Sequence, residues 1–293
     1  MNKTVTIFTP TYNRGHLLAD AYKSLLAQTV KDFMWLIIDD GSTDNTKSIV
    51  NAFQREGHID IKYVYQENHG QYWAHNTALK NAEGELLAFL DSDDVYTPNA
   101  VERILFYYNQ IKDDDDFAGV AGLKAHRSGK NIGGDIDYNI LDCSILDYRY
   151  RYYYKGDKLE CFKLKYAKLY PFPEFEGKYV PNALIWNRIS FQKKLRYFAE
   201  IVYLCDWSED SMSRTIIKNR RSTPDAYLLY YSELSNYDIP LWYKIRSAIN
   251  YWRFAPCSQK GLLEKLRGIS LWKSLLGLPL GTIFYLLDSL IKE

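Results

Sequence analysis

The stretch that decides the fold is Leu86-Leu87-Ala88-Phe89-Leu90-Asp91-Ser92-Asp93-Asp94, in which five apolar residues pass directly into a cluster of acids. A continuous apolar run of this length is typical of a strand buried on both faces of a parallel sheet. Residues 5–8, 35–38 and 61–65 have the same apolar, β-rich character. The chain therefore offers four strands of one type within its first hundred residues.

Apolar residues recur at helical spacing between these strands, near residues 17–26, 49–53 and 72–81. Alternation of strand and helix predicts an α/β fold, a Rossmann-like and mostly parallel sheet flanked by helices. A polar cluster follows every strand, at residues 9–13, 39–42, 67–70 and 91–94. Because ligands bind at the carboxyl ends of strands in open parallel sheets, four clusters in phase predict one site.

Acidity alone does not mark that site. Residues 113–116 are four consecutive aspartates, but they follow a helical pattern and no buried strand precedes them, so we expect a charged surface turn there. The acids at residues 91–94 end a buried strand instead. Carboxylates in that position suit Mg²⁺ or Mn²⁺, which prefer oxygen ligands and often take only one or two from the protein.

The chain resembles the family 2 glycosyltransferases, which have the GT-A fold. The resemblance rests on residues 9–14, 37–44 and 82–85, on Asn76, and on residues 89–94, in matching order and spacing. It covers about the first hundred residues. Residues 155–158, 170–173 and 186–188 are similar to a bacterial surface-polysaccharide subgroup.

The resemblance implies an inverting transfer of a sugar from a nucleotide diphosphate, a UDP-sugar by expectation, to a glycan or lipid-pyrophosphate-linked acceptor in capsule, exopolysaccharide or lipopolysaccharide synthesis. It implies that Pro10, Thr11 and Tyr12 line the nucleobase pocket, with Tyr12 stacking. Asp40 would bind the edge of the base, with Asp39 as the alternative. Further donor contacts are expected from four residues: Arg14, His75, Asn76 and Ser92.

The same resemblance assigns the acids. Asp91 would hold the ribose or the sugar, Asp93 would bind the Mn²⁺ or Mg²⁺ ion, and Asp94 would support one of them, so all three are candidate metal residues. His75 departs from the pattern, because many relatives have arginine there. A histidine is mostly neutral at pH 7 and does not replace that fixed charge.

The catalytic base is harder to place. An inverting enzyme needs a carboxylate that takes the proton of the acceptor hydroxyl. The resemblance leads us to expect an acid near residue 182, where the chain has Asn182. We expect Glu176 to be the base, followed by Asp210, with Glu174 as a third candidate. Asp210 has an alternative role, favouring the start of a helix predicted from Ser211 through the helix dipole.

Residues 148–168 are basic and rich in tyrosine. Two interpretations are equally open: a solvated segment with buried tyrosines, or an acceptor site in which rings stack on sugars and cations pair with pyrophosphate. A net charge of +1 argues against nucleic acid as a partner.

We expect a glycosyltransferase domain over residues 1–235, with a nucleotide-binding half (1–110) and an acceptor-binding half (111–235), followed by a helical extension over residues 236–293. Residues 269–291 are apolar but are interrupted by Lys273, Pro279 and Asp288, which disfavours a membrane span. They are either an interfacial element in peripheral contact with membrane or a helix covering the domain.

Four scattered cysteines without a C-x-x-C pair indicate a cytoplasmic protein, which we place at the inner face of the cell membrane.

Two other classes compete. A nucleotidyltransferase shares the sheet and a carboxylate pair but usually has a glycine-rich, basic phosphate loop, whereas residues 9–15 hold one glycine and one arginine. A non-catalytic nucleotide-sugar or glycan-binding module would account for Asn182.

Overall fold

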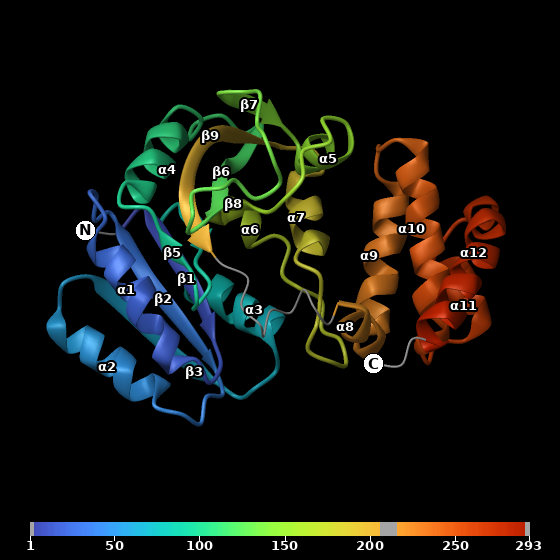
Figure 1. Cartoon of the computed structure of the whole chain (residues 1–293), viewed down its shortest axis with the longest axis horizontal. Helices are drawn as coiled ribbons and strands as arrows, with labels where there is room; N and C mark the ends of the chain where they lie inside the picture. The colour runs from blue at the N-terminus through green and yellow to red at the C-terminus, as the bar shows by residue number, and fades with distance from the viewer. Residues whose placement is uncertain (1–2, 206–215, 291–293) are drawn as a thin grey trace.

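The computed structural model describes residues 3–205 and 216–290, and Figure 1 shows their arrangement. The N-terminal half is a repeated strand–helix unit. Its strands are parallel and stand in the order β3-β2-β1-β4. The elements are β1 (Val5–Thr11), η1 (Gly15–Leu17), α1 (Leu18–Leu26), β2 (Phe33–Asp40), α2 (Thr46–Glu56), β3 (Asp60–Gln66), α3 (Gln71–Asn81) and β4 (Leu86–Phe89). The predicted parallel α/β unit is confirmed.

The second half continues the same sheet in the order β8-β6-β9-β5, with β7 also paired to β9. Its elements are β5 (Val95–Tyr96), α4 (Ala100–Asn109), β6 (Phe117–His126), β7 (Ile140–Cys143), α5 (Ile145–Tyr150), β8 (Lys158–Lys163), α6 (Leu164–Ala167), α7 (Ala183–Ser190) and β9 (Lys194–Cys205). β8 runs antiparallel to both of its neighbours, and β5 and β7 run antiparallel to β9. The sheet is therefore parallel in its first half and mixed in its second.

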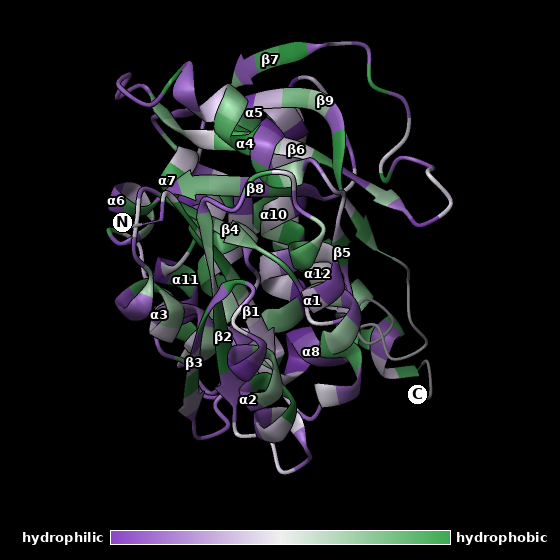
Figure 2. Ribbon diagram, turned by 90° about the vertical axis from the view of Figure 1, so that its left-hand side faces the viewer, coloured by the Kyte–Doolittle hydropathy of each residue, from purple (hydrophilic) through white to green (hydrophobic). Residues whose placement is uncertain are grey.

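Side chains of the central strands alternate between two cores. In β2, Phe33, Trp35 and Ile37 pack with α1, α2 and α4, whereas Met34, Leu36 and Ile38 pack with α3, α5, α6 and α7. Figure 2 shows hydrophobic colour along these central strands, whereas the surrounding helices show a mixture of hydrophobic and hydrophilic colour. Burial on both faces explains why β2 is continuously apolar until Asp39 and Asp40, at its end.

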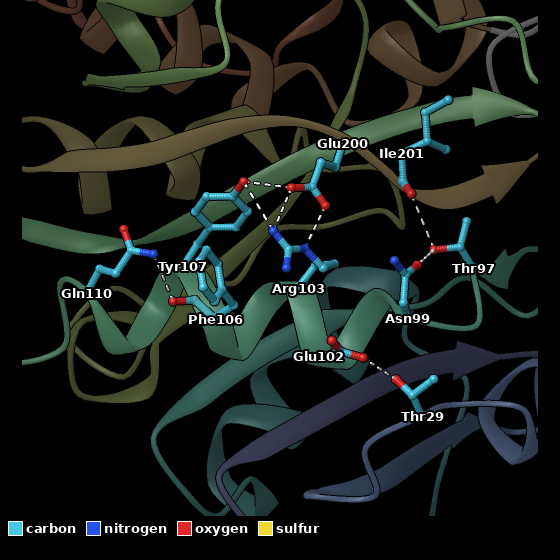
Figure 3. Close-up of polar contacts among 10 residues, drawn as sticks. All are labelled: Thr29, Thr97, Asn99, Glu102, Arg103, Phe106, Tyr107, Gln110, Glu200 and Ile201. Carbon is cyan, nitrogen blue, oxygen red and sulfur yellow. Dashed lines mark hydrogen bonds and ion pairs between the residues drawn. The ribbon is translucent and has the colours of Figure 1, made fainter.

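α4 is fastened to β9 by a polar group that Figure 3 shows in detail. The Arg103 guanidinium donates to both carboxylate oxygens of Glu200, at 2.7 and 2.8 Å, and the Tyr107 hydroxyl donates to the same carboxylate at 2.6 Å. The four aspartates that follow α4, residues 113–116, are exposed in the turn before β6. The prediction of a surface turn there is confirmed.

The C-terminal helices form a separate layer at one end of the sheet (Figure 1). They are α8 (Ile216–Ser222), α9 (Pro224–Asn236), α10 (Leu241–Phe254), η3 (Ala255–Cys257), α11 (Leu262–Arg267) and α12 (Leu271–Leu290). α9 and α10 share a core of their own, with Tyr227, Tyr231 and Trp252 among its members. This layer therefore includes α9, which precedes the boundary predicted at residue 236. Among the described residues, no helix is long and apolar enough to cross a membrane.

Candidate active site

The acids at residues 91–94, called the acidic turn below, lie where β4 ends and are held by a tyrosine from the far half of the sheet. The buried Tyr203 hydroxyl of β9 accepts from the Asp91 N–H at 3.0 Å and donates to Asp94 Oδ2 at 2.7 Å. The pairing of β5 with β9 sets this register, because Tyr96 lies opposite Tyr203. One phenol therefore fixes both the backbone and a side chain of the turn.

The charges of the acidic turn shift the pKa values of groups in and around it. Burial raises the pKa of Asp94, the neighbouring charge of Asp91 raises it more than the Tyr203 hydrogen bond lowers it, and together these effects bring the pKa to about 7. Lys124 of β6 lies with its Nζ 4.0 Å from the centre of the Tyr203 ring. Burial would lower the pKa of Lys124, but the charges of Asp91 and Glu160 outweigh burial and raise it.

Asp93 makes an ion pair with Arg14, from the loop after β1. Arg14 Nη1 lies 3.0 Å from Asp93 Oδ2, and both side chains are partly exposed. This contact joins the first and fourth strand ends, as the in-phase polar clusters predict. Ser92, also expected to contact the donor, is buried beneath the turn.

The acids fit a divalent cation that is shared with phosphates. Among the described residues, no three His, Cys, Asp or Glu side chains are arranged to hold an ion by themselves. Mg²⁺ and Mn²⁺ in phosphate sites, however, often take only one or two carboxylates. Asp91 and Asp93 are partly exposed and can serve in this way, whereas Asp94 is buried and turned onto Tyr203. This position agrees with the supporting role expected of Asp94, and whether Asp94 also contacts a metal ion stays a prediction.

The loops after β1 and β2 are tied together by Asn13, which has a left-handed backbone (φ 53°). Its Oδ1 accepts from the Thr43 N–H at 2.8 Å, and its own N–H donates to Ser42 Oγ at 2.9 Å. The neighbouring Tyr12 side chain is 48% exposed, so it is not a core ring and can offer its face to a ligand. Thr11 beside it is buried, and its hydroxyl lacks a hydrogen-bond partner within the described residues.

Asp39 and Asp40, at the end of β2, are both buried and hydrogen-bonded. Asp39 accepts from the Ser42 N–H at 2.8 Å and from the Tyr63 hydroxyl at 2.6 Å. Asp40 accepts from Gln66 Nε2 at 2.6 Å and from the N–H groups of residues 69 and 70 at 3.0 and 2.7 Å. Asp40 thus shapes the loop between β3 and α3. Whether Asp39 or Asp40 binds the edge of a nucleobase stays a prediction.

His75 lies in an aromatic box on α3 and not on the polar edge. Its ring stacks on Phe89 at 5.2 Å between centroids and is surrounded by Phe8, Phe172 and Trp186. Both ring nitrogens are buried and lack a partner within the described part of the chain. Burial lowers its pKa to about 3, so the ring is neutral. A contact with the donor would require these nitrogens to leave the box.

Asn76 fastens the segment that carries two candidate bases. Its amide donates to the Phe172 carbonyl at 2.9 Å and accepts from the Phe172 N–H at 2.8 Å. The Tyr72 hydroxyl donates to the Phe175 carbonyl at 2.8 Å. These bonds hold the segment against α3, and a hydrogen bond from Lys178 to Asn68 joins it to the loop between β3 and α3. Both Glu174 and Glu176 are exposed.

The structure describes Asn182, which stands where an acid was expected, but not the candidate base Asp210. Asn182 is the exposed residue before α7 and makes no capping hydrogen bond with its side chain. Asp210 lies outside the described residues, and so does the start of the helix predicted from Ser211. The preceding strand β9 ends at Cys205, two residues after Tyr203.

Tyr203 and Lys124 were not predicted from the sequence. Tyr203 is 112 residues away from Asp91, and no local motif surrounds it. The available signal was weak: Tyr203 lies in a long β-rich run that ends just before the acidic residues 206–210.

The chain belongs to glycosyl transferase family 2, which matches residues 6–163. It is 37% identical over 116 residues to an uncharacterized glycosyltransferase of Nostoc, covering 40% of this chain and 35% of the relative. It is 33% identical over 154 residues to the Escherichia coli UDP-Glc:alpha-D-GlcNAc-diphosphoundecaprenol beta-1,3-glucosyltransferase WfaP, covering 49% and 60%. The chain thus spans less than two thirds of either relative.

Solved structures share the fold along almost the whole chain. Staphylococcus aureus TarS 1-349 in complex with UDP-GlcNAc has a TM-score of 0.66 and 16% identity, covering 97% of this chain and 89% of that one. The mannosyltransferase PcManGT of Pyrobaculum calidifontis, in complex with GDP-Man and Mn²⁺, has a TM-score of 0.61 and 16% identity, covering 100% and 89%. The predicted GT-A fold is confirmed.

Proposed function

We propose that this family 2 glycosyltransferase is an inverting, cation-dependent enzyme that transfers a sugar from a UDP-sugar to a lipid-pyrophosphate-linked or glycan acceptor in surface-polysaccharide synthesis. The observation that carries the proposal is the acidic turn, whose Asp93 meets Arg14 beside the exposed Tyr12. WfaP, which acts on a diphosphoundecaprenol-linked sugar, supports the donor and acceptor classes.

The donor would lie across the carboxyl ends of β1, β2 and β4. Tyr12 would stack on the base, and Asp39 or Asp40 would accept from its edge. Asp91 would bind the ribose or the sugar. Asp93 and Asp91 would hold the divalent cation, which when bound offsets the charge that develops on the departing diphosphate. Arg14, a fixed cation at the same edge, can pair with a phosphate oxygen.

The transfer itself needs one proton acceptor. A carboxylate takes the proton of the acceptor hydroxyl as its oxygen attacks the anomeric carbon. The bond from that carbon to the diphosphate oxygen breaks on the opposite face, which inverts the configuration. Glu176 is our first candidate, because its segment is fastened to α3 beside the site. Asp210 and Glu174 are the alternatives.

Donor binding is tested by thermal unfolding with UDP-, GDP-, CMP- and dTDP-sugars, each with and without Mn²⁺. A ligand that binds the folded state raises the melting temperature according to ln(1 + [L]/Kd). We expect a shift with a UDP-sugar that requires Mn²⁺ and is lost in Asp93→Asn. Asp113→Asn, in the exposed turn after α4, is the matched control. No shift with any nucleotide would refute the proposal.

The base is identified by sugar-transfer assays on Glu176→Gln, Asp210→Asn and Glu174→Gln. We expect Glu176→Gln to lose transfer and to keep the donor-induced melting shift. Full activity in that variant would remove Glu176 from the role, and loss in Asp210→Asn would assign the role to Asp210. Donor binding without transfer to any acceptor would favour a non-catalytic binding module. Family membership removes the nucleotidyltransferase alternative.

A further inference from the structure

α12 presents its polar and small residues to the protein and its apolar residues to the outside. Its buried residues are Lys273, Ser274, Gly277 and Gly281. Eleven large apolar side chains, called the apolar face below, are between 40% and 78% exposed: Leu271, Trp272, Leu275, Leu276, Leu278, Leu280, Ile283, Phe284, Leu286, Leu287 and Leu290. A helix on the surface of a water-soluble domain has the opposite orientation.

Close packing fixes this orientation. A Cβ added at Gly277 would lie 2.7 Å from the Ala248 carbonyl carbon, and one added at Gly281 would lie 2.6 Å from the Ile249 carbonyl oxygen. Only glycine allows α12 to approach the α10 backbone so closely, and small residues four apart are typical of such helix contacts. The helix cannot rotate its leucines inward without losing this contact.

Polar bonds at both ends of α12 strengthen the same arrangement. Lys273 Nζ donates to the Ser235 carbonyl at 2.6 Å and to Asn236 Oδ1 at 2.8 Å. Near the other end, Arg253 of α10 makes a two-bond ion pair with Asp288, at 2.7 and 2.6 Å. The charged residues that interrupt the apolar sequence therefore face the protein, and the apolar face is left without charges.

The apolar face is far larger than single exposed leucines on ordinary surfaces. Eleven half-exposed side chains amount to an area on the order of 1,000 Å², whereas the largest apolar patch of a typical monomer is about 300–600 Å². α11, which is separated from α12 by three residues, adds the exposed Leu262 and Leu263. A patch of this size marks a surface that is covered by something apolar.

The charges around this surface favour an anionic lipid bilayer. Residues 241–290 contain seven lysines and arginines against two acids, Glu264 and Asp288. Both acids are already paired, with Lys260 and with Arg253. Four cations of this segment remain when these pairs and the buried Lys273 are set aside: Lys244, Arg246, Lys265 and Arg267. Their charge suits anionic headgroups, and Trp272 is a side chain typical of the membrane interface.

We propose that the apolar face of α12, with the exposed leucines of α11, lies in the interface of an anionic bilayer, parallel to its plane. This peripheral mode agrees with the absence of a spanning helix among the described residues. The inference goes beyond the proposed transfer reaction and does not depend on it. Of the two interpretations of residues 269–291, the proposal takes up the interfacial element.

The test is co-sedimentation of the full chain with vesicles of phosphatidylcholine alone and of phosphatidylcholine with phosphatidylglycerol. We expect binding to the anionic vesicles, several-fold less binding to the neutral ones or in high salt, and at least a tenfold loss in Leu275→Ser/Leu286→Ser. Ile140→Ser/Leu169→Ser, two exposed apolar residues of the sheet domain, is the matched control and should bind normally. Circular dichroism verifies that each variant is folded.

Two outcomes would overturn the proposal. One is failure of the native chain to bind the anionic vesicles. The other is a concentration-dependent dimer, seen by analytical ultracentrifugation, that persists with vesicles present and that Leu275→Ser/Leu286→Ser dissociates. The second result would assign the apolar face to another copy of the chain. Neither readout uses a nucleotide sugar, so a failure here is distinct from a failure of the proposed function.

Discussion

Replacement of His75 by phenylalanine should change how the stability of the protein depends on pH. The aromatic box leaves both ring nitrogens without partners, and burial lowers the pKa from 6.5 to about 3. Below pH 6.5, the His75 ring therefore binds a proton in the unfolded state but not in the folded state. Because the pKa is depressed on folding, stability is complete above the unfolded value and is lost as pH falls toward the folded value.

The magnitude follows from the unfolded pKa alone, provided that the ring stays neutral in the folded state. Between about pH 7.5 and about pH 5, protonation of the unfolded chain at this one site lowers the free energy of unfolding by about 2 kcal/mol. Phenylalanine cannot take the proton and matches its four aromatic neighbours. The stability of His75→Phe relative to the native protein should therefore rise by about 2 kcal/mol across this range.

Urea unfolding of both proteins at intervals of pH, without metal or nucleotide, measures this difference. All other titrating groups are common to the two proteins and cancel in the comparison. His58→Phe, which replaces an exposed histidine, is the control and should give a curve parallel to the native one. Parallel curves for His75→Phe would mean that His75 is charged or hydrogen-bonded in solution, and the aromatic box would be wrong.

Three further substitutions test separate contacts. Tyr203→Phe removes the hydroxyl that fixes the acidic turn and leaves a buried carboxylate without its donor, so we expect a loss of about 2 kcal/mol in urea unfolding and weaker cation-dependent donor binding. Arg103→Met keeps the apolar stem but removes the ion pair to Glu200; we expect about 1 kcal/mol of destabilisation at neutral pH, since both groups are partly exposed. That loss should shrink in acid, because the Arg103 hydrogen bond lowers the pKa of Glu200 and its contribution is lost as the carboxylate is protonated. Gly277→Val forces α12 away from α10 and should lower stability by about 1–3 kcal/mol in thermal unfolding.

The parallel half of the sheet could be predicted from sequence because its strands are buried on both faces. Residues 35–38 and 86–90 are continuously apolar for that reason, and each polar cluster sits at a strand end where topology brings it to the same edge. The second half carries a weaker signal. β8 contains Lys158, Glu160 and Lys163, which are buried through interactions that a sequence pattern does not reveal.

The contacts between residues of the site were harder to predict from the sequence than the motifs that supply those residues. Arg14 and Asp93 are 79 residues apart, and Tyr203 is 109 residues away from Asp94. His75 was expected to contact the donor, but its burial depends on rings from β1, β4, the segment after α6, and α7. Residue type and order predict which groups are available, whereas long-range packing decides which way each group points.

The ion pair between Arg14 and Asp93 has a consequence for the order of events at the site. Arg14 acts as an internal counterion of Asp93 Oδ2, so in the proposed site a divalent cation that binds this oxygen would displace it. The displaced guanidinium would then be free for a phosphate of the nucleotide. Each ligand would thereby prepare the place of the other, so we expect their binding to be cooperative, and thermodynamic linkage requires the enhancement to be equal in both directions. A titration with metal alone should consequently underestimate the affinity that the site has for metal when the nucleotide is present.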